Sequence, residues 1–259
     1  MTLVDLKVID GNVALITLNR PEAANAMSKG LLDDLNSTVK EINSNKQINC
    51  VIITGSGDKA FCAGADLKER SGMNDDQVVD AVRYIGQSVR AVESIKVPVI
   101  AALNGVAFGG GLELALGCDI RIAADTAKMG LTETSLAIIP GAGGTQRLPR
   151  LIGIGRAKQL IFSAKAISAN DALSIGLVEE IIPKEELLSY AIDVAKSIAK
   201  NGPIALRQAK TAINQGMQTE LSTGLEIEHL CYKGTIKTND RLEGLKAFKE
   251  KRTPNYQGN

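Results

Sequence analysis

The sequence predicts an α/β protein in which strands and helices alternate over the first half and helices dominate the last third. Three observations support this prediction. Short apolar runs rich in β-branched residues alternate with longer runs whose apolar residues recur every three or four positions, which is typical of parallel sheets. After Pro140 the strand-like runs give way to successive helical patterns. With 259 residues, 44% of them hydrophobic, the chain can bury a large core without disulfides.

The first half is read in order as strand, helix, strand, helix, strand. Residues 13–18 form a β-rich run after a turn signal, and 27–43 carry the apolar spacing of an amphipathic helix. Residues 50–54 are short, β-branched and bounded by glycine, so we expect a buried strand. Residues 75–95 then predict a helix and 97–103 another strand.

The remainder of the chain is expected to be nearly all helical. Glycine, serine, proline and asparagine separate the helical patterns. These patterns cover residues 154–163, 168–174, 184–200, 203–215, 218–233 and 238–250. We divide the chain into a core, 1–195, and a C-terminal helical region, 196–259, whose apolar residues are suited to packing against a second subunit.

Composition excludes several classes of protein. Thirty Lys and Arg against 29 Asp and Glu give a net charge of +1, without the basic excess expected of an electrostatic nucleic-acid binder. Four widely spaced cysteines form no C-x-x-C pair, and a single histidine, His229, gives little support to a metal site or a His-dependent triad. The N-terminus shows no signal peptide and no apolar run reaches membrane-spanning length, so we expect a cytoplasmic protein.

Two stretches rich in small residues are the main candidates for a binding site. Residues 109–111 are three glycines between a predicted strand and a helix-forming run. Ala63-Gly64-Ala65 also follows a strand and precedes a probable helix opened by Asp66. Backbone N–H groups at such helix starts lack intrahelical acceptors, and small residues let a ligand approach them. Two such loops could polarise one carbonyl oxygen, although close packing of helix on strand would also explain either loop alone.

Three sequence blocks, in this order and spacing, resemble the enoyl-CoA hydratase/isomerase, or crotonase, superfamily over essentially the whole chain. They are FCAGADLKE, NGVAFGGGLELALGCDIRIA and LAIIPGAGGTQRLPR. The resemblance implies a crotonase-like spiral of ββα units with a C-terminal helical trimerisation region. It also implies an acyl-CoA thioester substrate, a homo-oligomer (a trimer or a dimer of trimers), no membrane partner, and no cofactor, since coenzyme A is part of the substrate.

The same resemblance assigns the chemistry to four positions. The backbone N–H groups of Ala65 and Gly110 would form the oxyanion hole for the thioester carbonyl. Glu113 would be the base that holds water and Glu133 the acid, with the sharing of the proton left open. Having both acids favours hydration over the other reactions of the superfamily. Eight further residues would contact coenzyme A or substrate: Ala23, Ala24, Ala63, Asp66, Leu67, Lys68, Phe248 and Lys251.

Within the superfamily the chain is most similar to the methylglutaconyl-CoA hydratase branch, whose animal member is also an AU-rich RNA-binding homologue. Leu131-Thr132 stands where general short-chain hydratases tend to have Gln-Pro. That branch must hold a second substrate carboxylate, and the sequence does not single out the residue that would do so. We therefore expect an enoyl-CoA hydratase of fatty-acid or branched-chain amino-acid breakdown, with 3-methylglutaconyl-CoA hydratase of leucine degradation as the alternative.

RNA binding is a separate, non-enzymatic alternative. The stretch that would carry a row of lysines, residues 28–46, mixes Asp33, Asp34 and Glu41 with its lysines. A helix of mixed sign releases few counterions on binding a polyanion. The charge pattern therefore disfavours nucleic acid as a partner.

Overall fold

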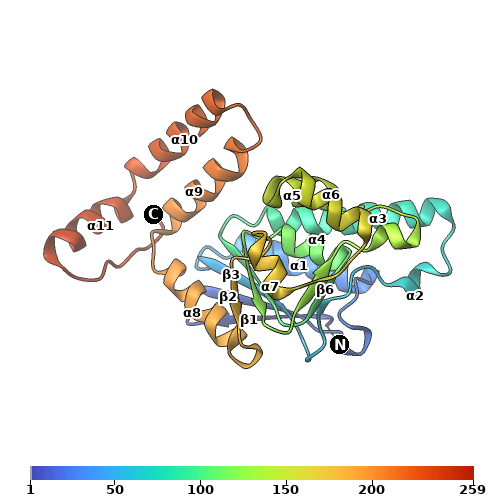
Figure 1. Cartoon of the computed structure of the whole chain (residues 1–259). Coiled ribbons are helices and arrows are strands. Elements are labelled where there is room, and N and C mark those ends of the chain that lie inside the picture. Colours follow the sequence, from blue (N-terminus) through green and yellow to red (C-terminus); the bar gives the residue numbers. More distant parts are fainter. Residues whose placement is uncertain (1) are drawn as a thin grey trace.

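The computed structural model describes residues 2–259, which form a two-sheet body and a helical arm (Figure 1). The larger sheet has the strand order β1-β2-β3-β5-β7-β10, and all its neighbours are parallel except β1 with β2. Its strands are β1 (Val4–Ile9), β2 (Val13–Leu18), β3 (Cys50–Gly55), β5 (Val99–Leu103), β7 (Ile120–Ala124) and β10 (Glu180–Ile182). The parallel α/β layout predicted from the sequence is confirmed.

The smaller sheet has the order β4-β6-β8-β9. Its strands are β4 (Ala60–Cys62), β6 (Val106–Phe108), β8 (Lys128–Gly130) and β9 (Ile167–Ser168). β4, β6 and β8 are parallel to one another, so their carboxyl ends share one edge. This edge positions the candidate site.

Eleven α-helices and three short 3₁₀ helices lie within residues 2–259. The α-helices are α1 (Lys29–Ser44), α2 (Leu67–Arg70), α3 (Asp75–Glu93), α4 (Gly110–Leu116), α5 (Gly144–Ile152), α6 (Ile154–Ser163), α7 (Ala169–Ser174), α8 (Leu187–Ala199), α9 (Pro203–Gly216), α10 (Leu221–Ile236) and α11 (Asn239–Glu250). The 3₁₀ helices are η1 (Pro21–Ala23), η2 (Glu133–Leu136) and η3 (Lys184–Glu186). None of these helices is both long and apolar enough to cross a membrane.

The core is built where the predicted strands and amphipathic helices meet. Every residue of β3 is buried, because the strand is covered on both faces, and α8 packs across β2, β3, β5 and β7. α1 packs against β1, β2 and α3 through the apolar stripe that its sequence periodicity predicts. All four cysteines are buried and free. They behave as small apolar core residues.

One helix that the sequence analysis did not predict follows Pro140. α5 begins in the glycine pair Gly143-Gly144 and contains Pro149, both typical of loops. It is helical because its apolar residues Leu148 and Ile152 are buried in the core, so tertiary packing outweighs local propensity.

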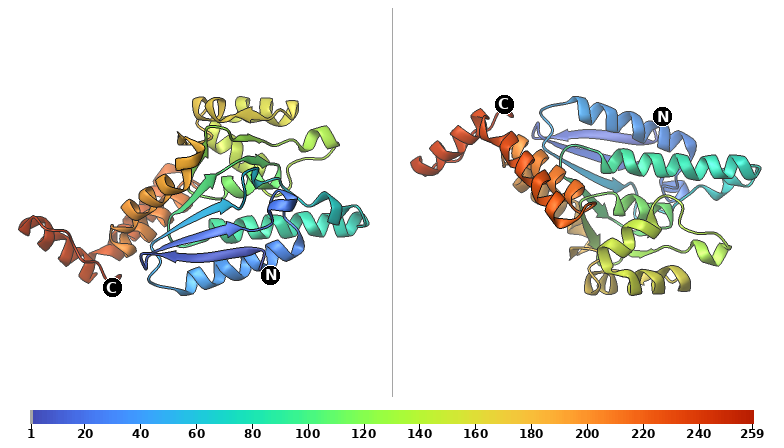
Figure 2. Two further views of the ribbon diagram at one scale, coloured as in Figure 1. Left: turned by 90° about the horizontal axis from the view of Figure 1, so that it is seen from below. Right: turned by 90° about the horizontal axis from the view of Figure 1, so that it is seen from above.

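The arm consists of α9, α10 and α11. α9 contacts the body through Lys210, and α11 lies apart from the body in all three views (Figures 1 and 2). The arm helices expose many large apolar side chains, although α9 and α10 pack on one another. The exposed residues are Ile213, Met217, Leu221, Leu225, Leu230, Tyr232, Leu242, Leu245 and Phe248. The predicted division after residue 195 lies inside α8, a helix that contacts the large sheet, and the arm begins with α9.

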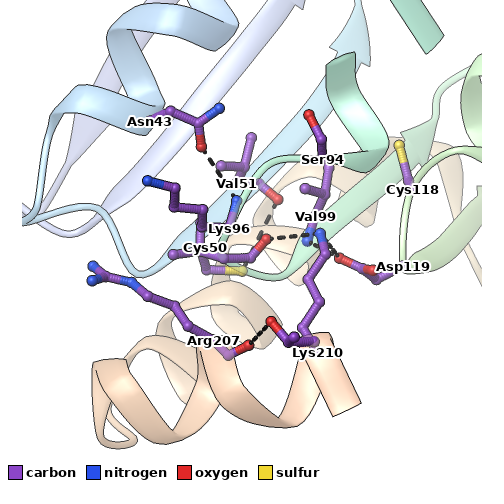
Figure 3. A network of polar contacts seen from close by, with 12 residues as sticks. Asn43, Cys50, Val51, Ser94, Lys96, Val99, Cys118, Asp119, Arg207 and Lys210 are labelled. Atoms are coloured by element: carbon purple, nitrogen blue, oxygen red, sulfur yellow. Dashed lines mark hydrogen bonds and ion pairs between the residues drawn. The ribbon is translucent and has the colours of Figure 1, made fainter. Parts of the chain in front are cut away.

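A buried ion pair fixes the first arm helix to the large sheet. The Nζ of Lys210 donates to the Val97 carbonyl at 3.0 Å and to Oδ2 of Asp119 at 2.7 Å (Figure 3). The same carboxylate oxygen accepts the backbone N–H of Val99 at 2.7 Å. Only 9% of the Lys210 side chain is exposed, against 25% of the Asp119 side chain. α9 is therefore fixed to the sheet at the start of β5.

Candidate active site

The candidate site lies at the carboxyl ends of three adjacent parallel strands. Ala65 follows β4, Gly110 follows β6 and Glu133 follows β8. Because β6 pairs with both β4 and β8, three segments that lie far apart in the sequence come together at one edge. Parallel α/β sheets usually place their binding sites at this end of the strands.

The glycines at the start of α4 have two separate structural reasons. Gly109 has φ +49°, and a Cβ there would lie 3.1 Å from Oε1 of Glu133. A Cβ on Gly111 would lie 2.0 Å from the carbonyl oxygen of Cys62. The helix thus approaches β4 more closely than any side chain would allow. Close packing of helix on strand is therefore present together with an unbonded N–H group at the buried Gly110.

Two backbone N–H groups from separate loops lie close together, and both residues line one cavity. A Cβ built on Gly110 would lie 3.7 Å from the backbone nitrogen of Ala65. Neither N–H donates to an acceptor in residues 2–259: Gly110 is the first residue of α4, and the bridge between Met27 and Ala65 uses the N–H groups of Met27 and Asp66 instead. Both donors are therefore available to a ligand oxygen.

Glu113 is held in a fixed orientation inside the core. Its side chain projects from α4, and only 2% of the residue is exposed. Oε1 accepts the backbone N–H groups of Ala142 at 2.8 Å and Gly144 at 2.7 Å, which leaves Oε2 for another partner. Burial raises the pKa of this carboxyl, and the two N–H donors oppose that rise.

Glu133 has the stronger perturbation of the two acids. It is the first residue of η2, and burial together with the nearby Glu113 raises its pKa to about 7. Oε2 is buried and makes no hydrogen bond to any residue of the described chain. A carboxyl group in this environment is partly protonated at neutral pH and can both give and accept a proton.

Both acids and both N–H positions line one cavity of about 140 Å³. Glycine and apolar side chains make up most of the remaining wall. They include Leu67, Val82, Ile85, Leu136, Ile138 and Ile139. One cationic side chain, Arg70, also lines the cavity, and the sequence analysis did not single it out. The only available signal was its place directly after the FCAGADLKE block, because spacing alone does not show which face of a short helix turns inward.

The predicted coenzyme A segments lie side by side. The Ala24 carbonyl accepts the N–H of Ala63 at 3.0 Å, so the loop at Ala23 and Ala24 joins the loop that holds Ala65. The side chain of Asp66 is already committed: it caps α2 by accepting the N–H groups of Lys68 and Glu69, and it pairs with Arg20 at 2.5 Å. Leu67 and Lys68 are exposed beside it.

The structure does not bring the two C-terminal candidates to the cavity of their own chain. Phe248 is 87% exposed on α11, and Lys251 ends that helix with φ +56°. Figure 1 places α11 at the far end of the arm from the body. His229 is exposed on α10, also in the arm. Within residues 2–259 no group of three or more His, Cys, Asp and Glu side chains is placed to hold a metal.

The site combines two free backbone N–H donors with two carboxyl groups of raised pKa. This combination is typical of an enzyme that transfers protons at a carbon atom next to a carbonyl group. Comparison with known proteins identifies the family. The family model described as enoyl-CoA hydratase/isomerase matches residues 8–259, and the chain belongs to this family.

Solved and curated proteins agree with this assignment. The crystal structure titled enoyl-CoA hydratase from Bacillus anthracis has a TM-score of 0.98 and 55% identity, covering 99% of this chain and 100% of that chain. Mouse mitochondrial methylglutaconyl-CoA hydratase is 49% identical over 95% of this chain and 80% of its own length. The short-chain-enoyl-CoA hydratase of Clostridium acetobutylicum is 44% identical over 94% of this chain and 93% of its own length. The predicted family and crotonase fold are confirmed.

Proposed function

We propose that this protein is an enoyl-CoA hydratase, a hydro-lyase that adds water across the 2,3 double bond of a 2-enoyl-CoA thioester. One observation carries the proposal: two carboxyl groups of raised pKa share a cavity with two unused backbone N–H groups. Hydration needs a base for water, an acid for the α-carbon and a stabiliser for the enolate oxygen. The cavity contains a candidate for each.

In the proposed reaction the thioester oxygen accepts hydrogen bonds from the N–H groups of Ala65 and Gly110. Glu113 takes a proton from water as the water oxygen bonds to C3, and the π electrons move to form an enolate whose charge rests on the thioester oxygen. Glu133 then gives a proton to C2, which restores the carbonyl. Net addition of one water molecule results, and donors fixed in advance stabilise the enolate without reorganisation.

The environments of the two acids support this division of roles. The two N–H groups on Oε1 of Glu113 orient the group and favour its ionised form. Glu133, with a pKa of about 7, keeps a proton in a large fraction of molecules at neutral pH. The pair titrates as a coupled system, so the proton can return from one acid to the other between turnovers.

The finer assignment is to 3-methylglutaconyl-CoA and leucine degradation. It is supported by the 49% identity to the mouse enzyme of that name, while the 44% identity to the clostridial enzyme supports a short-chain substrate. Either substrate would be consistent with a role in fatty-acid or branched-chain amino-acid breakdown.

We also propose where coenzyme A lies and how the chains assemble. The backbone at Ala23, Ala24 and Ala63 and the exposed Leu67 and Lys68 would contact the pantetheine and nucleotide. The apolar arm residues would be covered by other copies of the chain in a trimer or a dimer of trimers, in the cytoplasm. In such an assembly Phe248 and Lys251 would reach the nucleotide bound to a neighbouring subunit.

The test is the loss of enoyl-thioester absorbance with crotonyl-CoA and, in parallel, with 3-methylglutaconyl-CoA. We expect wild type to hydrate at least one ester, and Glu113→Gln and Glu133→Gln each to lose about a hundredfold or more, as expected for acid–base groups. Glu41→Gln, an exposed change on α1, is the matched control. Wild type that binds both esters but hydrates neither would show that the proposed reaction is wrong.

A further inference from the structure

Arg70 is the last residue of α2. Its side chain lines the cavity that contains Glu113 and Glu133. It also lines a neighbouring cavity of about 350 Å³, and Ile85 is the one other residue that both cavities share. Arg70 therefore stands between two cavities. One contains Glu113 and Glu133 and is called the reaction cavity below; the other lies along α3.

The guanidinium lies near Glu113 and Glu133 but forms no direct ion pair with either of them. It makes no ion pair and donates no hydrogen bond to any residue in the range 2–259. Three acidic residues line the neighbouring cavity beside it, and each of them bonds to another group. They are Asp66 with Arg20, Glu69 with the backbone N–H of Lys29, and Asp80 with Arg83.

A partly buried, unpaired guanidinium is costly for the protein to maintain. Burial is the largest influence on Arg70 and lowers its pKa, while the negative charge of Glu113 and Glu133 acts in the other direction. Glu133 offers limited compensation, because its own pKa of about 7 leaves it partly neutral at neutral pH. A guanidinium remains charged in proteins, so this position is suited to binding an anionic group of a ligand.

We propose that Arg70 binds a carboxylate at the far end of the substrate's acyl chain, so that the preferred substrate is a 2-enoyl-CoA carrying a second carboxyl group. This assignment rests on the proposed function. Among the residues that line the reaction cavity, Arg70 is the only cation, and the apolar wall is suited to the hydrocarbon between the two ends. Arginine binds carboxylates in a bidentate geometry, which would fix the chain as well as attract it.

Two other roles would leave Arg70 in the same place. It could act only on the charge state of Glu113 and Glu133, or it could bind the phosphates of coenzyme A. Both roles are independent of the acyl group, so removal of Arg70 would then affect every thioester equally. The preference for one acyl group over another separates the proposal from both.

The first experiment measures binding by titration calorimetry with glutaryl-CoA and butyryl-CoA, two saturated thioesters that cannot be hydrated. We expect wild type to prefer glutaryl-CoA, and Arg70→Gln to reduce that preference on the order of a hundredfold, the scale of losing one partner of a desolvated charge pair. Arg70→Lys should restore part of it, because the charge returns without the bidentate geometry. Arg156→Gln, a change of an exposed arginine on α6 that lines neither cavity, is the matched control.

An equal loss for both thioesters in Arg70→Gln, or equal affinity in wild type, would overturn the proposal. The wild-type comparison tests it even where Arg70→Gln does not fold. A second experiment compares kcat/KM for 3-methylglutaconyl-CoA and crotonyl-CoA, and we expect the loss in Arg70→Gln to be larger for the dicarboxylic ester and to lie mainly in KM. Absence of hydration with retained glutaryl-CoA preference would refute the proposed reaction while supporting this role of Arg70.

Discussion

Glu133→Gln should make the enzyme less active and, at alkaline pH, more stable relative to wild type. In the folded protein the Glu133 carboxyl has a pKa of about 7, against an ordinary value of 4.5. This rise corresponds to roughly 3 kcal/mol, at about 1.4 kcal/mol for each pKa unit. Because the side chain is partly exposed, solvent screening reduces the expected effect to about 2 kcal/mol.

The direction of the effect follows from proton binding. Below pH 4.5 both the folded and the unfolded chain hold the Glu133 proton, so the group does not affect stability. Between pH 4.5 and 7 the unfolded chain loses this proton while the folded chain keeps it, so the free energy of unfolding falls as pH rises. Above pH 7 the full penalty remains. Glutamine does not titrate, and the variant lacks this loss.

The measurement is urea unfolding of wild type and Glu133→Gln at pH 5, 6, 7 and 8, at one protein concentration because assembly affects apparent stability. We expect the variant's stability relative to wild type to increase by about 2 kcal/mol over this range. The fixed cost of placing an amide at the site cancels in that comparison. A difference that stays constant from pH 5 to 8 would refute the reasoning.

Three further predictions concern rate, backbone geometry and the arm. As Glu133 ionises, kcat/KM for hydration should fall about tenfold per pH unit above pH 7, and a flat pH–rate profile from 7 to 9 would contradict its role as the acid. Gly111→Ala should reduce the rate of hydration about a hundredfold or more, because its Cβ would lie 2.0 Å from the Cys62 carbonyl oxygen and displace α4. Near-normal activity with an unchanged circular dichroism spectrum would refute this geometry. Lys210→Met should lower the free energy of unfolding by about 1 to 2 kcal/mol, because Asp119 loses its buried partner but keeps some contact with water. Urea unfolding measures this loss, and an unchanged midpoint would show that the pair does not fix α9.

The sequence predicted the longer elements well because their patterns are local. β2, β3 and β5 are apolar runs long enough to be recognised, and α1 and α3 carry apolar stripes at helical spacing. Most of the predicted C-terminal helices also begin and end within three residues of the observed ones. β1 was missed because its residues are mostly exposed or half-buried and show no clear alternation.

The site required more than local patterns. β4, β6 and β8 contain three residues each, too few for a periodic signal, and they exist as strands because they pair with one another. Their pairing brings together loops that lie far apart in the sequence. The sequence alone identified the glycine-containing loops, and the resemblance identified the candidate acids. Neither predicted how close the loops and the acids lie in space.

By itself, then, the sequence determined the α/β class, the amphipathic helices and the family, since these depend on residue type and spacing along the chain. Only the tertiary structure decided how the candidate groups are charged. The raised pKa of Glu133 comes from burial and from Glu113, which lies twenty residues earlier in the chain. Within residues 2–259 Arg70 lacks an ion pair although five acids lie around it, because the three acids of the neighbouring cavity bond to other groups and neither Glu113 nor Glu133 reaches its guanidinium. Desolvation and charge interaction depend on distance in space, which local sequence does not encode.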